Sequence, residues 1–596
     1  MGLKRVVVGT LAVLGGFAIL VVAASIFLAW YFWPESPRPM HDRVILEADF
    51  EKELVENVVS DSVTGILSAT PSTVLETVMS LERAADDERV KGLIARVGGS
   101  GMGLAKIQEI RNVVQAFRKK GKFAVAYAQT MGEVGPGNGA YYLATAFDEI
   151  YMQPSGDLGL TGLAHQSPFV QGALEKVGVA PRLDRRGKYK TAVETFTERQ
   201  YSEANRESLT AIMESRFRQI VRSVAEARKL TENEVRGLVD RGPFLGQEAV
   251  DAALVDGLAY RDEVYDAVKK KFDGEAQFLS LEKYGALTRK EEENGPVVAL
   301  IYGVGPVHLG KSSHSRLLGE ESMGSDTVTA AFRAAIEDEE VRAILFRVDS
   351  PGGSYVASDM IWRETVRAGK AKKPVIVSMG ELAASGGYFV SASADKIVAQ
   401  PATLTGSIGV FGGKVVTKGL WDKLGVTWDE VHTSAHSNMW SPIKDFTPEE
   451  WKRVQDWLDR VYDDFTRKVA LGRNLELGSV LEAAQGRVWT GEDAKFLGLV
   501  DELGGFPEAL MLAKKAASIP EEAGIQLKLF PLRKSLAEKL MVRLLDEEED
   551  AVEEEEISSV MGFALEVAQP LIRFGKAMGL ISTPGVLTMP DAEYLR

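Results

Sequence analysis

The chain of 596 residues contains no cysteine, which excludes disulfide bridges, thiolate metal sites and a cysteine nucleophile. Histidine is scarce, and the six residues are His41, His165, His308, His314, His432 and His436. None stands in a metal-binding spacing such as His-Glu-x-x-His, so we expect neither a metal site nor a cofactor. Acidic residues outnumber basic ones, and the formal net charge of −15 argues against a nucleic-acid partner.

The amino terminus carries one long stretch without any charged residue. Val6 to Trp33 spans 28 residues, more than the roughly 20 that cross a bilayer and more than the roughly 7–15 apolar residues of a cleavable signal peptide. Basic residues precede it and an aromatic cluster ends it, which predicts an uncleaved anchor with the body outside the cytoplasmic membrane. The alternative is a long signal peptide cut near Ala23–Ser25.

A segment of the body occurs twice. Val341 to Ser354 (VRAILFRVDSPGGS) matches Val90 to Gly103 (VKGLIARVGGSGMG), and Ser385-Gly-Gly-Tyr matches Asn138-Gly-Ala-Tyr. The copies are unequal, because Asn138 stands where the other copy has Ser385. Only the second copy can therefore supply a serine nucleophile at this position.

Each copy alternates apolar strands with amphipathic helices, which predicts a largely parallel sheet in each. In the first copy we expect strands at 90–96 and 123–127 around a helix at 104–119. In the second we expect strands at 297–302, 344–348 and 375–378, with a helix near 356–369.

These patterns predict five regions of the chain: an anchor and stalk at 1–39, a first α/β domain at 40–287, a charged linker at 288–296, a second α/β domain at 297–520, and a tail at 521–596. The tail contains nine acidic residues within 546–556 and an apolar stretch at 560–580. We expect a solvated loop and a packing helix there.

Two glycine-rich turns follow neighbouring strands of the second copy. Ser385 precedes Gly386 and Gly387 at the expected start of a helix, where backbone N–H groups favour developing negative charge. Ser350-Pro351-Gly352-Gly353 follows the preceding strand, and its glycines can present backbone N–H groups as an oxyanion hole does. A helix-capping serine and a plain turn are the structural alternatives, but the two turns together favour a catalytic site.

The base that would activate the serine is less evident from the residues alone. His432 and His436 lie in a polar stretch without an obvious orienting acid, whereas a lysine base is an established variant of serine catalysis. The first copy offers Lys188 and Lys190 before a small and apolar run. Lysines in an unknown fold are usually surface residues, so the residues alone leave this choice open.

At this point the chain resembles the long form of the signal peptide peptidase A family, membrane-anchored serine–lysine proteases of bacteria. The resemblance rests on the amino-terminal span and four motifs in order: GKYKTAVETF at 187–196, SPGG at 350–353, ELAASGGYF at 381–389 and LTGSIGVFG at 404–412. It covers nearly the whole chain, although the segment from about 530 to 580 matches no motif.

The resemblance implies tandem-duplicated Clp/crotonase-like α/β domains behind a transmembrane helix. It implies Ser385 as nucleophile, Lys190 as general base and Ser407 beside the lysine amine. The N–H groups of Gly353 and Ser385 would form the oxyanion hole, with Gly352 as an alternative. It further implies apolar peptide substrates such as released signal peptides, a homotetramer, and a bacterial inner-membrane location with the body on the periplasmic side.

A lysine base must be neutral, yet a free lysine has a pKa of about 10.4. Lowering this pKa by about three units disfavours the charged form by about 4 kcal/mol. We therefore predict that Lys190 is buried and has no carboxylate partner. Two other functions remain as alternatives: an acyl-CoA enzyme of the crotonase type, and a non-catalytic membrane scaffold.

One further motif is misleading. Gly305 to Ser312 fits the phosphate-loop pattern GxxxxGK[ST], but a phosphate loop must open a helix and the residues that follow are polar and rich in glycine and serine. We therefore do not expect nucleotide binding.

Overall fold

The computed structural model describes residues 40–57, 71–99, 101–272, 274–289, 295–315, 320–531 and 587–588. The predicted span at 6–33, the stalk, most of the linker, and the acidic and apolar stretches of the tail lie outside these residues. Within the described ranges, no helix combines the length and apolar character needed to cross a bilayer.

The first half is built on a parallel sheet with the strand order β8-β4-β3-β2-β1-β9. Its strands are β1 (Val44–Asp49), β2 (Val90–Arg96), β3 (Phe123–Ala128), β4 (Glu149–Met152), β8 (Gly257–Leu258) and β9 (Gln277–Ser280). Its helices are α2 (Val74–Asp86), α3 (Leu104–Lys119), α4 (Asn138–Ala144), α5 (Gln171–Val177), α6 (Glu194–Thr197), α7 (Glu203–Arg228), α8 (Glu232–Arg241), α9 (Gly246–Asp251), α10 (Arg261–Lys270) and α11 (Leu281–Thr288). A short pair, β5 (Asp157–Leu158) and β7 (Phe244–Leu245), lies beside it.

The second half repeats this plan in the parallel order β22-β18-β17-β15-β10-β23. The far end of β17 also pairs with β19, and β21 pairs antiparallel with β19. Its strands are β10 (Val297–Val304), β15 (Val341–Ser350), β17 (Val375–Ala384), β18 (Lys396–Ala399), β19 (Leu404–Gly406), β21 (Val488–Thr490), β22 (Glu502–Leu503) and β23 (Gln526–Phe530). Its helices are α12 (Ser325–Glu337), α13 (Tyr355–Lys370), α14 (Gly386–Ser391), α15 (Lys418–Lys423), α16 (Pro448–Arg473), α17 (Leu477–Ala483), α18 (Gly491–Phe496) and α19 (Phe506–Ala516).

The repeat lies in the order of elements, because β2-α3-β3-α4-β4 of the first half corresponds to β15-α13-β17-α14-β18 of the second. The α/β fold with two matching halves is thus confirmed, and the strands and helices expected within the two copies are present. The apolar side chains Ile107, Ile110, Val114 and Phe117 are buried along one face of α3, at the spacing that predicted this helix.

Two strands of the second half, β17 and β23, differ from what the sequence predicted. β17 continues six residues past 378 to Ala384, because its far end pairs with β19 after the register with β15 shifts. β23 pairs in parallel with β10, so the second sheet continues past residue 520, where we had expected the domain to end.

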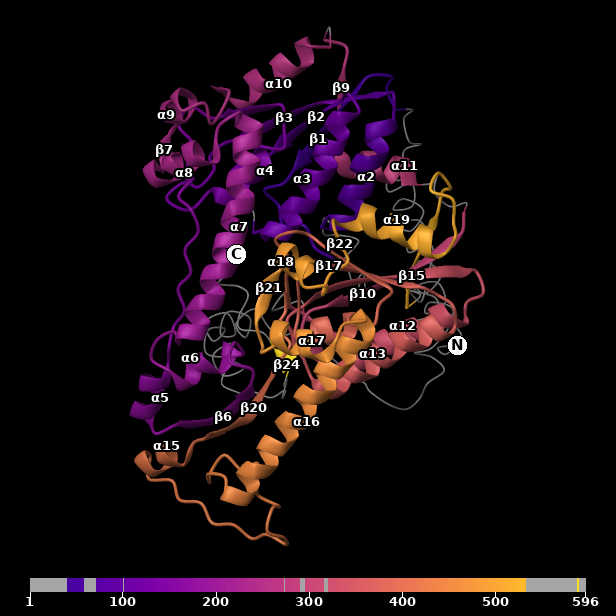
Figure 1. Ribbon diagram of the computed structural model, residues 1–596. Coiled ribbons are helices and arrows are strands. Elements are labelled where there is room, and N and C mark those ends of the chain that lie inside the picture. The colour runs from indigo at the N-terminus through magenta and orange to yellow at the C-terminus, as the bar shows by residue number, and fades with distance from the viewer. Residues whose placement is uncertain are drawn as a thin grey trace, which may run out of the picture.

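The two halves share structure at their boundary. β6 (Ala180–Arg186) of the first half pairs antiparallel with β20 (Val410–Val416) of the second over seven residues. The helix α7 runs along one side of the molecule from the first sheet past β21 (Figure 1). The largest buried apolar cluster also combines residues of both halves, for example Leu93 with Leu345 and Phe506. The halves therefore pack as one body around a common core.

A small sheet stands next to the second half. It joins β11 (Val307–His308), β14 (Met323–Gly324), β16 (Gly352–Gly353) and β24 (Leu587–Thr588), and a separate hairpin joins β12 (His314–Ser315) with β13 (Glu320–Glu321). β24 pairs antiparallel with β16, with Thr588 opposite Gly352 and Leu587 opposite Gly353. A segment near the end of the chain thus lies along the glycine-rich turn.

Candidate active site

Ser385 stands at the sharp turn between β17 and α14. Its backbone has φ 57° and ψ −114°, a conformation that non-glycine residues rarely adopt and that is often found at functional sites. The two glycines after it have no room for a side chain: a Cβ on Gly386 would lie 2.8 Å from the Ser358 Oγ, and one on Gly387 would lie 2.6 Å from the Ser350 carbonyl oxygen. The close packing of this turn therefore explains the Ser-Gly-Gly sequence.

Lys190 reaches this serine from the first half of the chain. It follows β6, and the β6–β20 pairing carries its loop to the second half, where the Tyr189 N–H donates to the Gln485 carbonyl at 2.8 Å. Gly486 packs directly against the lysine, because a Cβ on this glycine would lie 2.5 Å from the backbone nitrogen of Lys190. The Lys190 Nζ lies 2.8 Å from the Ser385 Oγ, and both side chains are fully buried.

The lysine amine makes two further contacts, both with Ser407. Its Nζ donates to the Ser407 carbonyl oxygen and to the Ser407 Oγ, each at 3.0 Å. A neutral amine has two N–H groups and one lone pair, so donation to the two Ser407 oxygens leaves the lone pair for the Ser385 hydroxyl. The three contacts thus fit a neutral amine that accepts a proton from Ser385.

Burial lowers the pKa of the Lys190 amine to about 7, and no charged neighbour contributes to this shift. Among the described residues, no carboxylate forms an ion pair with Lys190. Lys188, two residues earlier, is exposed and lies over the Tyr189 ring instead of facing the serine. His432 and His436 are about half exposed and each approaches a glutamate. Of the candidate bases, Lys190 is the one in contact with Ser385.

The Ser350–Gly353 turn lies against the same site. Gly353 has φ 158°, and a Cβ there would lie 2.0 Å from the Val307 carbonyl oxygen, so only glycine fits. The Gly353 nitrogen borders Gly386, because a Cβ on Gly386 would lie 2.9 Å from it. The turn therefore reaches the first residue of α14, next to the serine.

Two of the backbone N–H groups expected in the oxyanion hole are bonded elsewhere in the protein. The Ser385 N–H donates to the Gly406 carbonyl at 2.8 Å, as part of the β17–β19 pairing. The Gly352 N–H donates to the Ser350 Oγ at 3.1 Å. Gly386 was not among the expected residues, although its position as the first residue of a helix, where backbone N–H groups have no partner within the helix, was a usable signal.

In the first half, Asn138 occupies the position of Ser385, and its side chain is engaged in hydrogen bonds to the backbone. The Asn138 Oδ1 accepts the N–H groups of Thr161 and Gly162 at 3.1 Å each, and its Nδ2 donates to the Gly162 carbonyl at 2.8 Å. Asn138 thus fastens the segment that matches the Ser407 loop of the second half. The duplicated chain thus has one serine at this position, in the second half, and the lysine beside it comes from the first half.

Known proteins resemble this chain over most of its length. The sequence matches peptidase family S49 over residues 116–274 and 367–520. Protease 4 of Haemophilus influenzae is 33% identical over 475 residues, which cover 76% of this chain and 74% of that protein. This chain belongs to peptidase family S49.

Two other relatives are similar over different lengths. The serine protease SPPA of Arabidopsis thaliana chloroplasts is 32% identical over 454 residues, 74% of this chain and 65% of that protein. A putative signal peptide peptidase SppA of Enterococcus faecium is 35% identical over 220 residues, 37% of this chain and 64% of that protein. The chain is thus a serine protease of this family.

The two S49 segments carry complementary parts of the site. Residues 116–274 contain Lys190, and residues 367–520 contain Ser385 and Ser407, whereas the turn at 350–353 precedes the second segment. The apparent phosphate loop of this S49 peptidase opens no helix: Gly305–Ser312 passes through β11 and leads to β12, and α12 begins only at Ser325.

Proposed function

We propose that this S49 protease is a serine endopeptidase with Ser385 as nucleophile and Lys190 as general base. The observation that carries the proposal is the fully buried Lys190 amine, 2.8 Å from the Ser385 Oγ. Its pKa of about 7 makes about half of the amine neutral at pH 7, whereas a free lysine is almost wholly charged. Ser407 holds the amine in place.

The reaction follows acyl-transfer chemistry. The Ser385 Oγ attacks the peptide carbonyl while its proton moves to the Lys190 amine, which gives a tetrahedral oxyanion and an ammonium ion. The C–N bond then breaks, and the ammonium returns its proton to the departing amine. Water next attacks the ester carbonyl, Lys190 again accepts a proton, and Ser385 leaves as the restored hydroxyl.

We assign the oxyanion hole to the Gly353 and Gly386 N–H groups. They come from neighbouring turns that face each other beside Ser385, and Gly386 lies at the amino terminus of α14. The Ser385 and Gly352 N–H groups, expected from the sequence, are engaged by the Gly406 carbonyl and the Ser350 Oγ. Preorganised donors of this kind contribute about 3–4 kcal/mol each to transition-state stabilisation.

The substrates are proposed to be apolar peptides, and released signal peptides in particular. The antiparallel pairing of β24 with β16 supports a peptide substrate, because it places an extended segment on the turn beside the serine. The name of the Enterococcus faecium relative supports the signal peptide. A bilayer anchor at Val6–Trp33, a periplasmic body and a homotetramer complete the proposal. The anchor and its orientation rest on the charge and aromatic pattern of the amino terminus, and the homotetramer rests on the sequence resemblance.

Hydrolysis of an internally quenched peptide of leucine, valine and alanine tests this function. The full chain, Ser385→Ala, Lys190→Ala and the matched control Lys188→Ala are assayed in detergent. We expect both site variants to fall to background while folded, and the exposed Lys188 variant to keep full activity. Activity in Lys190→Ala would assign the base elsewhere. Inactivity of the wild type towards several peptides, with no labelling by a serine-reactive phosphonate, would favour a scaffold or an acyl-CoA enzyme.

A further inference from the structure

Two helices at the boundary between the halves begin with a glycine that supplies no capping side chain. α3 of the first half has Gly103 at its N-cap, and α19 of the second half has Gly505. Each helix receives a carboxylate from the opposite half. The Glu381 Oε2 accepts the Ala105 N–H at 2.8 Å, and the Glu109 Oε1 accepts the Phe506 N–H at 2.7 Å.

The glycines leave room for these incoming carboxylates. A Cβ on Gly103 would lie 2.2 Å from the Glu381 Cδ, and one on Gly505 would lie 2.4 Å from the Glu109 Oε1. The corresponding helix of the second half, α13, is capped by its own Ser354. In the first half the N-cap serine is replaced by Gly103, and a strand of the catalytic half supplies the cap.

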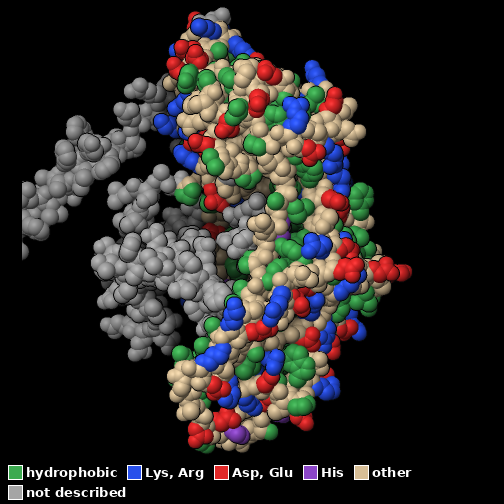
Figure 2. Space-filling model, turned by 90° about the vertical axis from the view of Figure 1, so that its left-hand side faces the viewer, with side chains coloured by type: hydrophobic (Ala, Val, Ile, Leu, Met, Phe, Trp, Pro, Cys, Tyr) green, Lys and Arg blue, Asp and Glu red, His purple; other side chains and the backbone are tan. Residues whose placement is uncertain are grey.

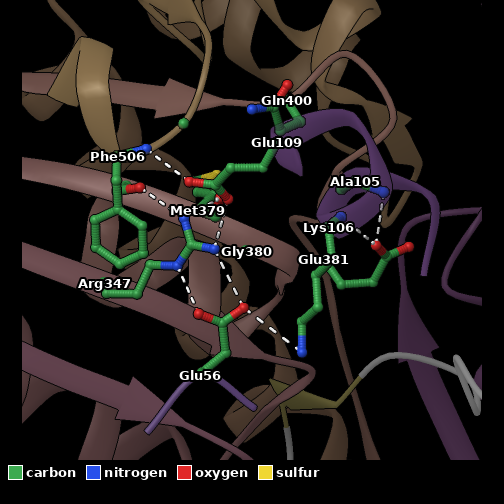
Figure 3. Close-up of polar contacts among 12 residues, drawn as sticks. Glu56, Ala105, Lys106, Glu109, Arg347, Met379, Gly380, Glu381, Gln400 and Phe506 are labelled. Carbon is green, nitrogen blue, oxygen red and sulfur yellow. Dashed lines mark hydrogen bonds and ion pairs between the residues drawn. The ribbon is translucent and has the colours of Figure 1, made fainter. Parts of the chain in front are cut away.

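Glu381 lies on β17, four residues before Ser385, and makes a second contact. Its Oε1 accepts from the Arg216 Nη2 of α7 at 2.9 Å, with both side chains largely buried (the Glu381–α3 contact is drawn in Figure 3). Ile212 of α7 also belongs to one buried apolar cluster with Leu382 and Ala384 of β17. The last residues of the strand that carries the serine are therefore fixed against α7.

The same helix holds the loop of Lys190 at its amino terminus. Glu194, four residues after the lysine, accepts from the Ser202 Oγ at 2.7 Å and the Asn205 Nδ2 at 2.9 Å. It also pairs with Arg185, whose guanidinium contacts the Lys190 carbonyl oxygen at 3.4 Å. From Asn205 to Arg216 the helix rises about 16 Å. α7 thus links the lysine loop at one end to the serine strand further along.

A largely buried ion network lies beside the Glu381 cap. Arg347 of β15 lies between Glu56 and Glu109 (Figure 3). Its Nη1 also donates to the Ser378 Oγ of β17 at 2.8 Å. The Lys106 Nζ lies 3.6 Å from Glu56 and 3.5 Å from Asp349. Burial alone would lower the Lys106 pKa, but the carboxylates of Glu56, Asp349 and Glu381 raise it above its ordinary value. These residues fix β15, which ends at the Ser350–Gly353 turn.

We infer that Glu381 is a positioning residue, whose carboxylate sets the serine strand against the half that carries the lysine by joining it to α3 and to Arg216 of α7. This role rests on the proposed Ser385–Lys190 function. Glu381 itself touches neither residue. Without this contact, the two halves pack less tightly around the Lys190 amine. Water then reaches the amine and favours its charged form.

The test is a pH profile of kcat and KM between pH 5 and 10 for the full chain and for Glu381→Gln. The amide keeps an acceptor for the Ala105 N–H but loses the charge that pairs with Arg216. Asp459→Asn is the matched control, since the Asp459–Arg186 pair also joins the halves but its aspartate is exposed. We expect Glu381→Gln to lower kcat at least tenfold with KM changed less than threefold, and to move the acidic limb of kcat/KM up by about one pH unit.

The position of this limb separates the inference from a general loss of stability. The inference is overturned if the acidic limb of kcat/KM in Glu381→Gln stays at the wild-type pH, whether kcat is unchanged or lowered. If the glutamine variant is poorly folded, Arg216→Gln removes the same ion pair from the helix side and is measured in the same way. The rate of labelling by a fluorophosphonate across pH gives a second measure of the limb. Failure of the proposed function is distinct, because Ser385→Ala would then leave activity unchanged.

Discussion

Replacing Lys190 with methionine removes a fully buried amine whose pKa burial lowers from its ordinary value of about 10.5 to about 7. Between these values the unfolded chain binds a proton that the folded protein does not bind. Stability of the wild type therefore rises with pH through this window. Methionine carries no ionisable group, so the variant lacks this contribution.

The magnitude follows from the size of the pKa shift. At about 1.36 kcal/mol for each unit, the buried amine costs about 4 kcal/mol of folding free energy at pH 7 and about 1.4 kcal/mol at pH 9.5. The stability difference between Lys190→Met and the wild type should therefore change by about 3 kcal/mol over this range, in favour of the wild type at higher pH. The Ser385 and Ser407 hydroxyls lose a partner in the variant. This cost is the same at each pH, so it cancels when the stability differences at two pH values are subtracted.

Urea unfolding followed by tryptophan fluorescence at pH 7, 8, 9 and 9.5 measures this difference. Lys452→Met serves as control, because Lys452 is exposed on α16 and the same substitution there leaves the site untouched. A flat difference for Lys190→Met would show that the amine keeps an ordinary pKa. The neutral-lysine mechanism would then be refuted.

Three further results follow from the site. Ser407→Ala removes one of the acceptors of the Lys190 amine and should lower kcat about tenfold with little change in KM, in steady-state peptide hydrolysis. Gly353→Ala places a Cβ 2.0 Å from the Val307 carbonyl oxygen and should reduce kcat at least a hundredfold; retained activity would remove Gly353 from the oxyanion hole. Deleting residues 581–596 removes β24 from β16 and should lower KM for peptides at least threefold, whereas an unchanged KM would show that β24 does not compete with substrate.

The outer surface offers little that the sequence had not already implied. On the face drawn in Figure 2, basic and acidic side chains are interspersed and do not form one large basic patch. The informative charges are buried between the halves, where Arg347, Glu56, Glu109 and Lys106 meet. Their arrangement could not be predicted, because each residue read alone is an ordinary charged residue on a helix, strand or loop.

Elements with a strong apolar period were predictable, whereas elements that depend on long-range pairing were not. The helix at 104–119 was predicted with the bounds it has, since its apolar residues recur on one face. The far end of β17 was missed because Gly380 and Glu381 interrupt the apolar run, although pairing with β19 continues the strand. β23 was missed because this short strand exists through its pairing with β10.

The residues alone establish the duplication, the restriction of the serine to one copy, and the absence of any cysteine nucleophile. They also supplied Lys190 as a candidate, through a resemblance of motifs. Tertiary packing places this lysine beside a serine 195 residues away and seals it from water. It also engages the Ser385 and Gly352 N–H groups, which the sequence had offered as oxyanion donors. Neither outcome could be predicted, since burial and hydrogen-bond partners are properties of the packed chain and not of any local pattern.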